Sequence, residues 1–144
     1  MVSIGDLPPS MSSHVGYLTI RLAGLAKESF ERAIEPLGLR PALYDVLAVV
    51  AELGPESQRD LAAVLGIDPA RVVALVDELE SSGLAERRVD PDDRRRRVVA
   101  PTRRGRDVHG RALRAARLVE ADLLDALTPA ERTVLRDLLR RTIA

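Results

Sequence analysis

The sequence predicts a mainly α-helical fold of the α+β winged-helix kind, with a small β-hairpin as its wing. Two short helical patterns, over residues 57–65 and 68–82, are separated by a tight turn at Gly66, as in a helix-turn-helix. Two strand-like segments follow and are joined by an arginine-rich loop over residues 90–96, which predicts a hairpin. Longer helical patterns flank this region on both sides. We therefore expect six helices and a wing of two or three strands.

Two helices are expected before the helix-turn-helix. Apolar residues recur at helical spacing from residue 11 to about residue 35, and Pro36 and Gly38 end the pattern. Pro41 opens a second helix, which Gly54 terminates. The chain is accordingly divided into an N-terminal helix for dimerisation (1–35), a winged helix-turn-helix module (36–102) and C-terminal helices for dimerisation (103–144).

The helix-turn-helix has recognisable boundary residues. Ser57 can cap the first helix, and Gly66 ends it. Asp68 can cap the second helix, and Pro69 occupies its first position, where no N–H is needed. The second helix is amphipathic, and its core face carries Val72, Leu75, Val76 and Leu79. Its opposite face carries Ala70, Arg71, Val73, Ala74, Asp77 and Glu78.

The wing and two more helices complete the chain. Residues 84–89 and 97–100 are expected to pair as strands. Pro101 has no N–H for a strand ladder, so we expect it to shorten the second strand. Thr102 can cap a long helix that reaches about Leu127, and residues 128–131 form a capping box that opens the last helix.

Charge is distributed unevenly along this chain of zero net charge. The 22 basic and 22 acidic side chains balance. Residues 87–117, however, hold 12 arginines against four aspartates, and the remainder of the chain is correspondingly acidic. Such a local basic segment is expected of a surface that faces phosphate groups. The sequence thus indicates a nucleic-acid partner in spite of its neutral total.

Several functional classes are disfavoured by what the sequence lacks. It has no cysteine, which excludes disulfides, thiolate metal sites and thiol-based redox switches. Its two histidines, His14 and His109, stand far apart, and no nucleophile motif, metal-ligand spacing or glycine-rich phosphate loop is present. We expect no enzyme, no catalytic residue, no metal and no cofactor. No apolar run approaches the roughly 18 residues that span a membrane, so we expect a cytoplasmic protein without a membrane partner.

Several short motifs in and around the winged module are more specific than a bare helix-turn-helix. They are Gly66-Ile67-Asp68-Pro69, Leu75-Val76-Asp77-Glu78-Leu79-Glu80, Gly83-Leu84, Asp90-Pro91, Asp93-Arg94-Arg95, and Thr102 with Gly105-Arg106. Together they resemble the MarR family of bacterial transcription regulators. The resemblance covers nearly the whole chain, because the flanking helices fall where that family places its dimerisation helices. It implies a triangular homodimer that binds DNA and often responds to a small aromatic or phenolic ligand.

The exposed face of the second helix is the predicted reading surface for double-stranded DNA. Arg71 can hydrogen-bond N7 and O6 of a guanine, or it can pair instead with Asp68 or Asp77 of its own helix. The acidic second half of the helix must tilt away from the phosphates or be neutralised. The other residues expected at this surface are Pro69, Ala70, Val73 and Ala74, of which the last three suit thymine methyl groups.

Two further segments are predicted to reach the DNA. Ser57 and Gln58, at the start of the preceding helix, can bind phosphate through hydroxyl, amide or backbone N–H. In the wing, the three arginines Arg94, Arg95 and Arg96 can enter a minor groove or clamp phosphates. The resemblance implies the groove-inserting role for Arg95. Asp93 is expected to hold the arginines by an ion pair without touching DNA.

The terminal helices predict the assembly. Their apolar faces are wider than a small module needs, so we expect a homodimer that reads a palindromic operator; the alternative is that these helices complete a monomeric core. The resemblance also implies an effector cleft, for which the candidates by position are His14, Tyr17, Arg21 and Tyr44.

The favoured function is a ligand-released repressor. Two alternatives remain open: an architectural DNA-binding protein without an effector, and a winged-helix module for protein–protein assembly whose arginine wing meets an acidic partner.

Overall fold

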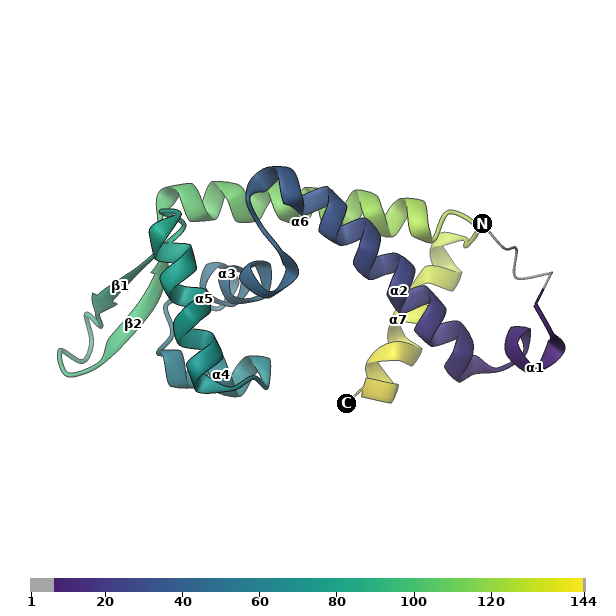
Figure 1. Cartoon of the computed structure of the whole chain (residues 1–144), viewed down its shortest axis with the longest axis horizontal. Coiled ribbons are helices and arrows are strands. Elements are labelled where there is room, and N and C mark those ends of the chain that lie inside the picture. Colours follow the sequence, from purple (N-terminus) through teal and green to yellow (C-terminus); the bar gives the residue numbers. More distant parts are fainter. Residues whose placement is uncertain (1–6, 144) are drawn as a thin grey trace. The chain divides into compact units, whose positions relative to one another are not determined.

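The computed structural model describes residues 7–143, which form a helical chain with one hairpin (Figure 1). These residues contain seven α-helices and a two-stranded antiparallel sheet, which confirms the mainly α winged-helix class with one helix more than expected. The elements are α1 (Pro9–Ser12), α2 (Val15–Ile34), a 3-10 helix (Glu35–Leu37), α3 (Pro41–Glu52), α4 (Gln58–Leu65), α5 (Pro69–Ser81), β1 (Ala85–Val89), β2 (Arg97–Pro101), α6 (Arg103–Leu123) and α7 (Pro129–Ile143).

Two helix boundaries differ from the expectation. The first expected helix is divided, because α1 ends after a single turn at Ser12 and α2 begins at Val15. The long helix α6 ends at Leu123 rather than near Leu127. Beyond Leu123 the backbone bonds become shorter-range, because the Leu127 N–H donates to the Leu124 carbonyl at 2.9 Å, three residues back, in place of the α-helical bond.

The chain forms two compact units. The first, which we call the winged unit, is Glu31–Ala115; the second, the terminal unit, comprises the residues up to Phe30 and from Ala116 onward. The winged unit is larger than the module expected over residues 36–102. The reason is that the first turns of α6 bury Val108, His109 and Ala112 in its core.

The winged unit has a continuous apolar core. Helix α5 packs against α3, α4 and β1, and β2 packs against α3. The four core-face residues predicted for α5, Val72, Leu75, Val76 and Leu79, are at most 2% exposed. Burial of each such side chain stabilises the fold by about 1.5–3 kcal/mol. Helix α5 is therefore held firmly by one face, which leaves the other face for a partner.

The wing is an antiparallel hairpin in which Ala85 pairs with Pro101 and Val89 pairs with Arg97. The prediction that Pro101 shortens the second strand is wrong, because Pro101 is the last residue of β2. A strand end tolerates the missing donor, and the Pro101 carbonyl accepts a hydrogen bond from Arg106 Nη1 at 2.8 Å. Glu56 adds a single antiparallel bridge to Val99, so the wing has two strands and one further bridge residue.

Helix α6 is joined to the end of α5 by a close backbone contact. The Thr102 hydroxyl donates to the Gly83 carbonyl at 2.7 Å and accepts from the Gly105 backbone N–H at 2.9 Å. A Cβ built on Gly105 would lie 1.9 Å from the Leu84 carbonyl oxygen. This contact explains why a threonine and a glycine stand three residues apart here: the first caps α6, and the second lets the helix approach the chain.

The terminal unit is built differently. None of its described side chains is buried. The capping box at the start of α7 is confirmed, since the Thr128 backbone N–H donates to Glu131 Oε2 at 2.8 Å and the Glu131 N–H donates to Thr128 Oγ1 at 3.3 Å. Across residues 7–143, no helix combines the length and the hydropathy that a membrane crossing requires.

Candidate nucleic-acid interface

The helix-turn-helix is fixed by the capping residues that the sequence predicted. Ser57 Oγ accepts from the Asp60 backbone N–H at 3.2 Å, and Asp68 Oδ1 accepts from the Ala70 N–H at 2.8 Å. Gly66, which ends α4, has a φ of 62°, a left-handed conformation that glycine adopts without steric cost. The turn between α4 and α5 is thus set by local hydrogen bonds and by one glycine, which presents α5 at a defined angle.

The face of α5 opposite the core is exposed, as predicted. Arg71 lies in its first turn and forms no ion pair with Asp68 or Asp77 within the described residues. The alternative in which this guanidinium is held by its own helix is therefore not observed. The residues that share the exposed face are Pro69, Ala70, Val73 and Ala74.

The three carboxylates in the acidic half of α5 are paired with two arginines from other elements. Arg87 of β1 lies with Nη2 2.7 Å from Asp77 Oδ1, and its Nη1 contacts Glu80. Its backbone N–H also donates to Glu80 Oε1 at 2.6 Å. Burial alone would lower the pKa of Arg87, but its bonds to Asp77 and Glu80 raise it overall. Arg40 Nη2, at the start of α3, lies 2.6 Å from Glu78 Oε2. The carboxylates of α5 thus repel an approaching phosphate less than their number suggests.

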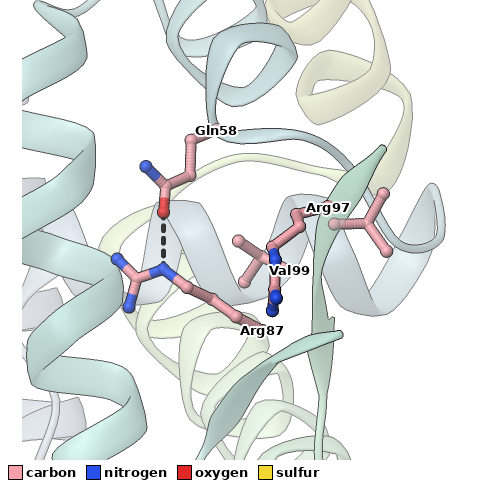
Figure 2. A pocket seen from close by; sticks show the side chains of 5 residues that line it. Gln58, Arg87, Arg97 and Val99 are labelled. Atoms are coloured by element: carbon pink, nitrogen blue, oxygen red, sulfur yellow. Dashed lines mark hydrogen bonds between the residues drawn. The ribbon is translucent and has the colours of Figure 1, made fainter. Parts of the chain in front are cut away.

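Gln58 and Arg87 border a pocket between α4 and the wing. Arg87 Nε donates to Gln58 Oε1 at 2.6 Å (Figure 2). The pocket has a volume of about 360 Å³ and is lined by Gln58, Arg87, Arg97, Val98 and Val99. Gln58 was predicted to bind phosphate; the structure places its amide oxygen on Arg87, which leaves the amide N–H groups for an acceptor outside the chain.

The tip of the wing is ordered by hydrogen bonds from its own aspartates. Asp90 Oδ1 accepts from the Asp92 N–H at 3.0 Å, and Asp93 Oδ1 accepts from the Arg95 N–H at 2.9 Å. Asp93 therefore supports the wing through the backbone, and the expected ion pair with an arginine side chain is not formed among the described residues. The side chains of Arg94 and Arg95 are exposed and have no carboxylate partner in the described part of the chain.

Arg96 forms ion pairs with three carboxylates within the protein, and its DNA contact stays a prediction. Its Nη2 lies 2.6 Å from Asp60 Oδ2 and 3.5 Å from Glu56 Oε2, and its Nη1 lies 3.2 Å from Asp90 Oδ2. The hydrogen bond to Asp60 is the largest cause of the raised pKa of Arg96. Arg96 thus attaches the wing to the start of α4.

Ser57 is also engaged within the protein. Its hydroxyl donates to Asp60 Oδ2 at 2.6 Å, and this bond is the first cause of the lowered pKa of Asp60, with Arg96 the second. The hydroxyl proton of Ser57 is therefore already used. A phosphate contact at this position would have to come from backbone N–H groups of the first turn of α4.

The effector candidates belong to both units. His14, Tyr17 and Arg21 are in the terminal unit, and Tyr44 is in the winged unit. The Tyr44 ring stacks on His109, with centroids 5.9 Å apart and an interplanar angle of 21°. Burial, followed by the charges of Glu52 and Asp45, raises the pKa of Tyr44, so its phenol stays protonated near neutral pH. Convergence of the four candidates on one cleft remains a prediction.

Arg87 is one residue at this interface that the sequence did not indicate. It lies on the same strand face as Ala85, which is buried. Because strand side chains alternate, this spacing of two places Arg87 toward the helices rather than toward solvent. The acidic residues of α5, Asp77 and Glu80, are then the partners to expect for Arg87.

The comparisons with known proteins agree with this geometry. A model described as the MarR family matches residues 37–96. A relative from Thauera aromatica, described as a transcriptional regulatory protein for the hcr operon, is 34% identical over 92% of this chain and 80% of its own length. CouR from Rhodococcus jostii RHA1, solved bound to p-coumaroyl-CoA, is 35% identical with a TM-score of 0.78, over 90% of this chain and 92% of its own.

A second solved structure, a transcriptional repressor named CouR bound to a 23-mer DNA duplex, is 29% identical with a TM-score of 0.81, over 100% of this chain and 99% of its own. These relatives are regulators of transcription, in agreement with the expectation that the chain is not an enzyme. With its winged unit, its motifs and its relatives in accord, the chain belongs to the MarR family of winged-helix transcriptional regulators.

Proposed function

We propose that this protein is a homodimeric repressor that binds a palindromic operator and is released by a small aromatic ligand. The observation that carries the proposal is the state of the charges on α5. The carboxylates Asp77, Glu78 and Glu80 are paired with arginines of other elements, whereas Arg71 on the same helix has no ion-pair partner in the described residues. A helix whose carboxylates are paired, and whose Arg71 is available, can enter a major groove and hydrogen-bond a guanine.

The dimer is proposed from the terminal unit. Its helices expose large apolar side chains, among them Val15 at 77% and Leu118 at 68%. A second copy of the same surface would cover them by two-fold symmetry, and it would place two α5 helices for one palindrome.

The effector is proposed to be an aromatic acid or its coenzyme A thioester. The relative CouR was solved with p-coumaroyl-CoA. In this chain, the neutral phenol of Tyr44 would suit the phenolic end of such a ligand. Ligand binding releases DNA only if the ligand prefers a spacing of the two α5 helices that the operator does not accept.

Operator binding is tested by titrating the protein against DNA from upstream of its own gene at several salt concentrations. We expect a protected inverted repeat and a steep loss of affinity with salt. Arg95→Ala should weaken binding to all sequences. Arg71→Ala should in addition relax the preference for one base pair per half-site, which corresponds to about 1–3 kcal/mol of discrimination. If both variants bind the operator as tightly as the parent protein does, these assignments are wrong.

The effector is tested on the preformed complex of protein and operator. We expect p-coumaroyl-CoA or p-coumarate to dissociate the complex, with coenzyme A alone as the control. Tyr44→Phe should raise the ligand concentration that is needed and leave operator affinity unchanged. Persistence of the complex with all aromatic acids and thioesters would favour a constitutive DNA-binding protein.

A further inference from the structure

We propose that the pocket between α4 and the wing binds one phosphate of the DNA backbone, with Arg97 supplying the charge and Gln58 an amide donor. The inference rests on the proposed DNA-binding function. It assigns a phosphate contact to Arg97, and it gives Arg87 the role of positioning Gln58.

Three polar side chains gather around the pocket (Figure 2). The strand register places Arg87 opposite Val99 and Val89 opposite Arg97. Cross-strand partners and residues two apart share one face of a hairpin. Arg87 and Arg97 therefore lie on the same face of the wing, and Gln58 of α4 reaches that face through its bond to Arg87.

The two arginines of the pocket differ in their partners. Arg87 is bound to two carboxylates, Asp77 and Glu80, so its charge is more than compensated. Arg97 is exposed and has no carboxylate partner within the described residues. The Arg97 guanidinium is therefore the group of this pocket that is available to an anion, and a guanidinium binds phosphate oxygens with two parallel hydrogen bonds.

The bond between Gln58 and Arg87 determines what the amide can bind. Because Oε1 is held by Arg87 Nε at 2.6 Å, the Nε2 group is the part of the amide that remains to face a ligand, and it can only donate. Among the five side chains that line the pocket, Gln58 Nε2 and Arg97 thus present donors, and the acceptor Gln58 Oε1 is already bound to Arg87, which fits an anion with several acceptor oxygens.

The location of the pocket favours a DNA phosphate over a free anion. It lies between the first residue of α4 and the wing, and Arg87 on its border also contacts Asp77 of α5. DNA held by the exposed face of α5 and by the wing tip would pass its sugar–phosphate backbone along this side. Phosphate contacts of this kind fix the register of a reading helix without carrying sequence information.

Three variants that each lower the charge of the chain by one unit provide the test. Arg97→Gln removes the proposed phosphate ligand. Gln58→Glu keeps the acceptor for Arg87 but replaces the amide donor by an oxygen that repels phosphate. Arg88→Gln is the matched control, because Arg88 is next to Arg87 in β1 but does not line the pocket. Operator affinity is measured at several salt concentrations, and urea unfolding verifies that each variant is folded.

We expect Arg97→Gln and Gln58→Glu to weaken operator binding roughly tenfold. The slope of the salt dependence should fall by about 0.9 for each phosphate that the variant no longer binds. Arg88→Gln should change both quantities much less, and base preference should stay the same in all three.

Equal effects of the three variants would mean that only the overall charge of the protein affects operator affinity. That result would overturn the proposal but not the proposed DNA binding. A second result would also overturn the proposal: inorganic phosphate or ATP stabilises the parent protein but not Arg97→Gln, while both proteins bind the operator with the same affinity. Failure of the parent protein itself to bind operator DNA at low salt would instead refute the proposed function.

Discussion

The winged unit and the terminal unit are both built from amphipathic helices, but the apolar faces are buried in the winged unit and largely exposed in the terminal unit. Every buried apolar side chain of the described residues belongs to the winged unit. In the terminal unit, Leu118 and Leu138 remain 68% and 50% exposed. Apolar residues at helical spacing predict that one face of a helix will be buried, but they do not indicate whether the burying surface belongs to the same chain or to another copy. The two units thus separate what one copy stabilises alone from what we propose a second copy must complete.

The largest effect is expected from removing a core side chain of the winged unit. Leu79 is fully buried on α5, so Leu79→Ala leaves a cavity and should lower the free energy of unfolding by about 2–5 kcal/mol. Urea denaturation measures this decrease. It should be the same at all protein concentrations, because the side chains that pack around Leu79 belong to the same chain.

The matched change in the terminal unit is Leu138→Ala. Its effect on unfolding should depend on protein concentration, because the packing that it removes is proposed to lie between two chains. If the decrease in the free energy of unfolding is as independent of protein concentration for Leu138→Ala as for Leu79→Ala, the proposed difference between the two units is contradicted.

A smaller decrease in stability is expected where α6 meets the winged unit. In Gly105→Ala, the new Cβ would lie 1.9 Å from the Leu84 carbonyl oxygen, and relief of this overlap should cost about 1–3 kcal/mol. Gly110→Ala on the same helix is the control. There the nearest atom to a new Cβ is the end of the Arg114 side chain, at 3.7 Å. Alanine also favours a helix over glycine by about 1 kcal/mol, so thermal unfolding should move in opposite directions for the two variants.

The smallest effect concerns the attachment of the wing. The pKa of Asp60 is lowered from 3.8 by the Ser57 hydroxyl and then by Arg96. A lowered pKa of a carboxyl group means that its stabilisation is present above the unfolded value and is lost as the pH falls through the folded value. The parent protein should therefore exceed Asp60→Asn in stability at pH 6, and the difference should vanish as the pH falls below 3.8. A difference that is independent of pH in urea unfolding would contradict the role of this carboxylate.

Local patterns predicted the winged unit well. The caps Ser57 and Asp68 and the core face of α5 were readable because each depends on residues a few positions apart. The start of α7 was predicted for the same reason.

Contacts between distant segments were not readable in this way. The bond between Arg96 and Asp60, which is 36 positions earlier in the chain, was not predicted. The length of the second wing strand was also misjudged, because the rule for proline in a strand applies to interior positions and Pro101 is terminal. Charge counts along the sequence located an arginine-rich segment, and only the fold showed that Arg87 and Arg96 in it are paired with carboxylates.

The most direct test of this account is the mass of the protein in solution, measured by light scattering at micromolar concentration. We predict twice the 15.7 kDa of one chain for the parent protein. Leu138→Asp should give the single-chain mass and lose operator binding, whereas Thr133→Asp, which adds the same charge to α7 outside its apolar face, should remain a dimer. A single-chain mass for the parent protein, or full operator binding by a monomeric Leu138→Asp, would contradict the account.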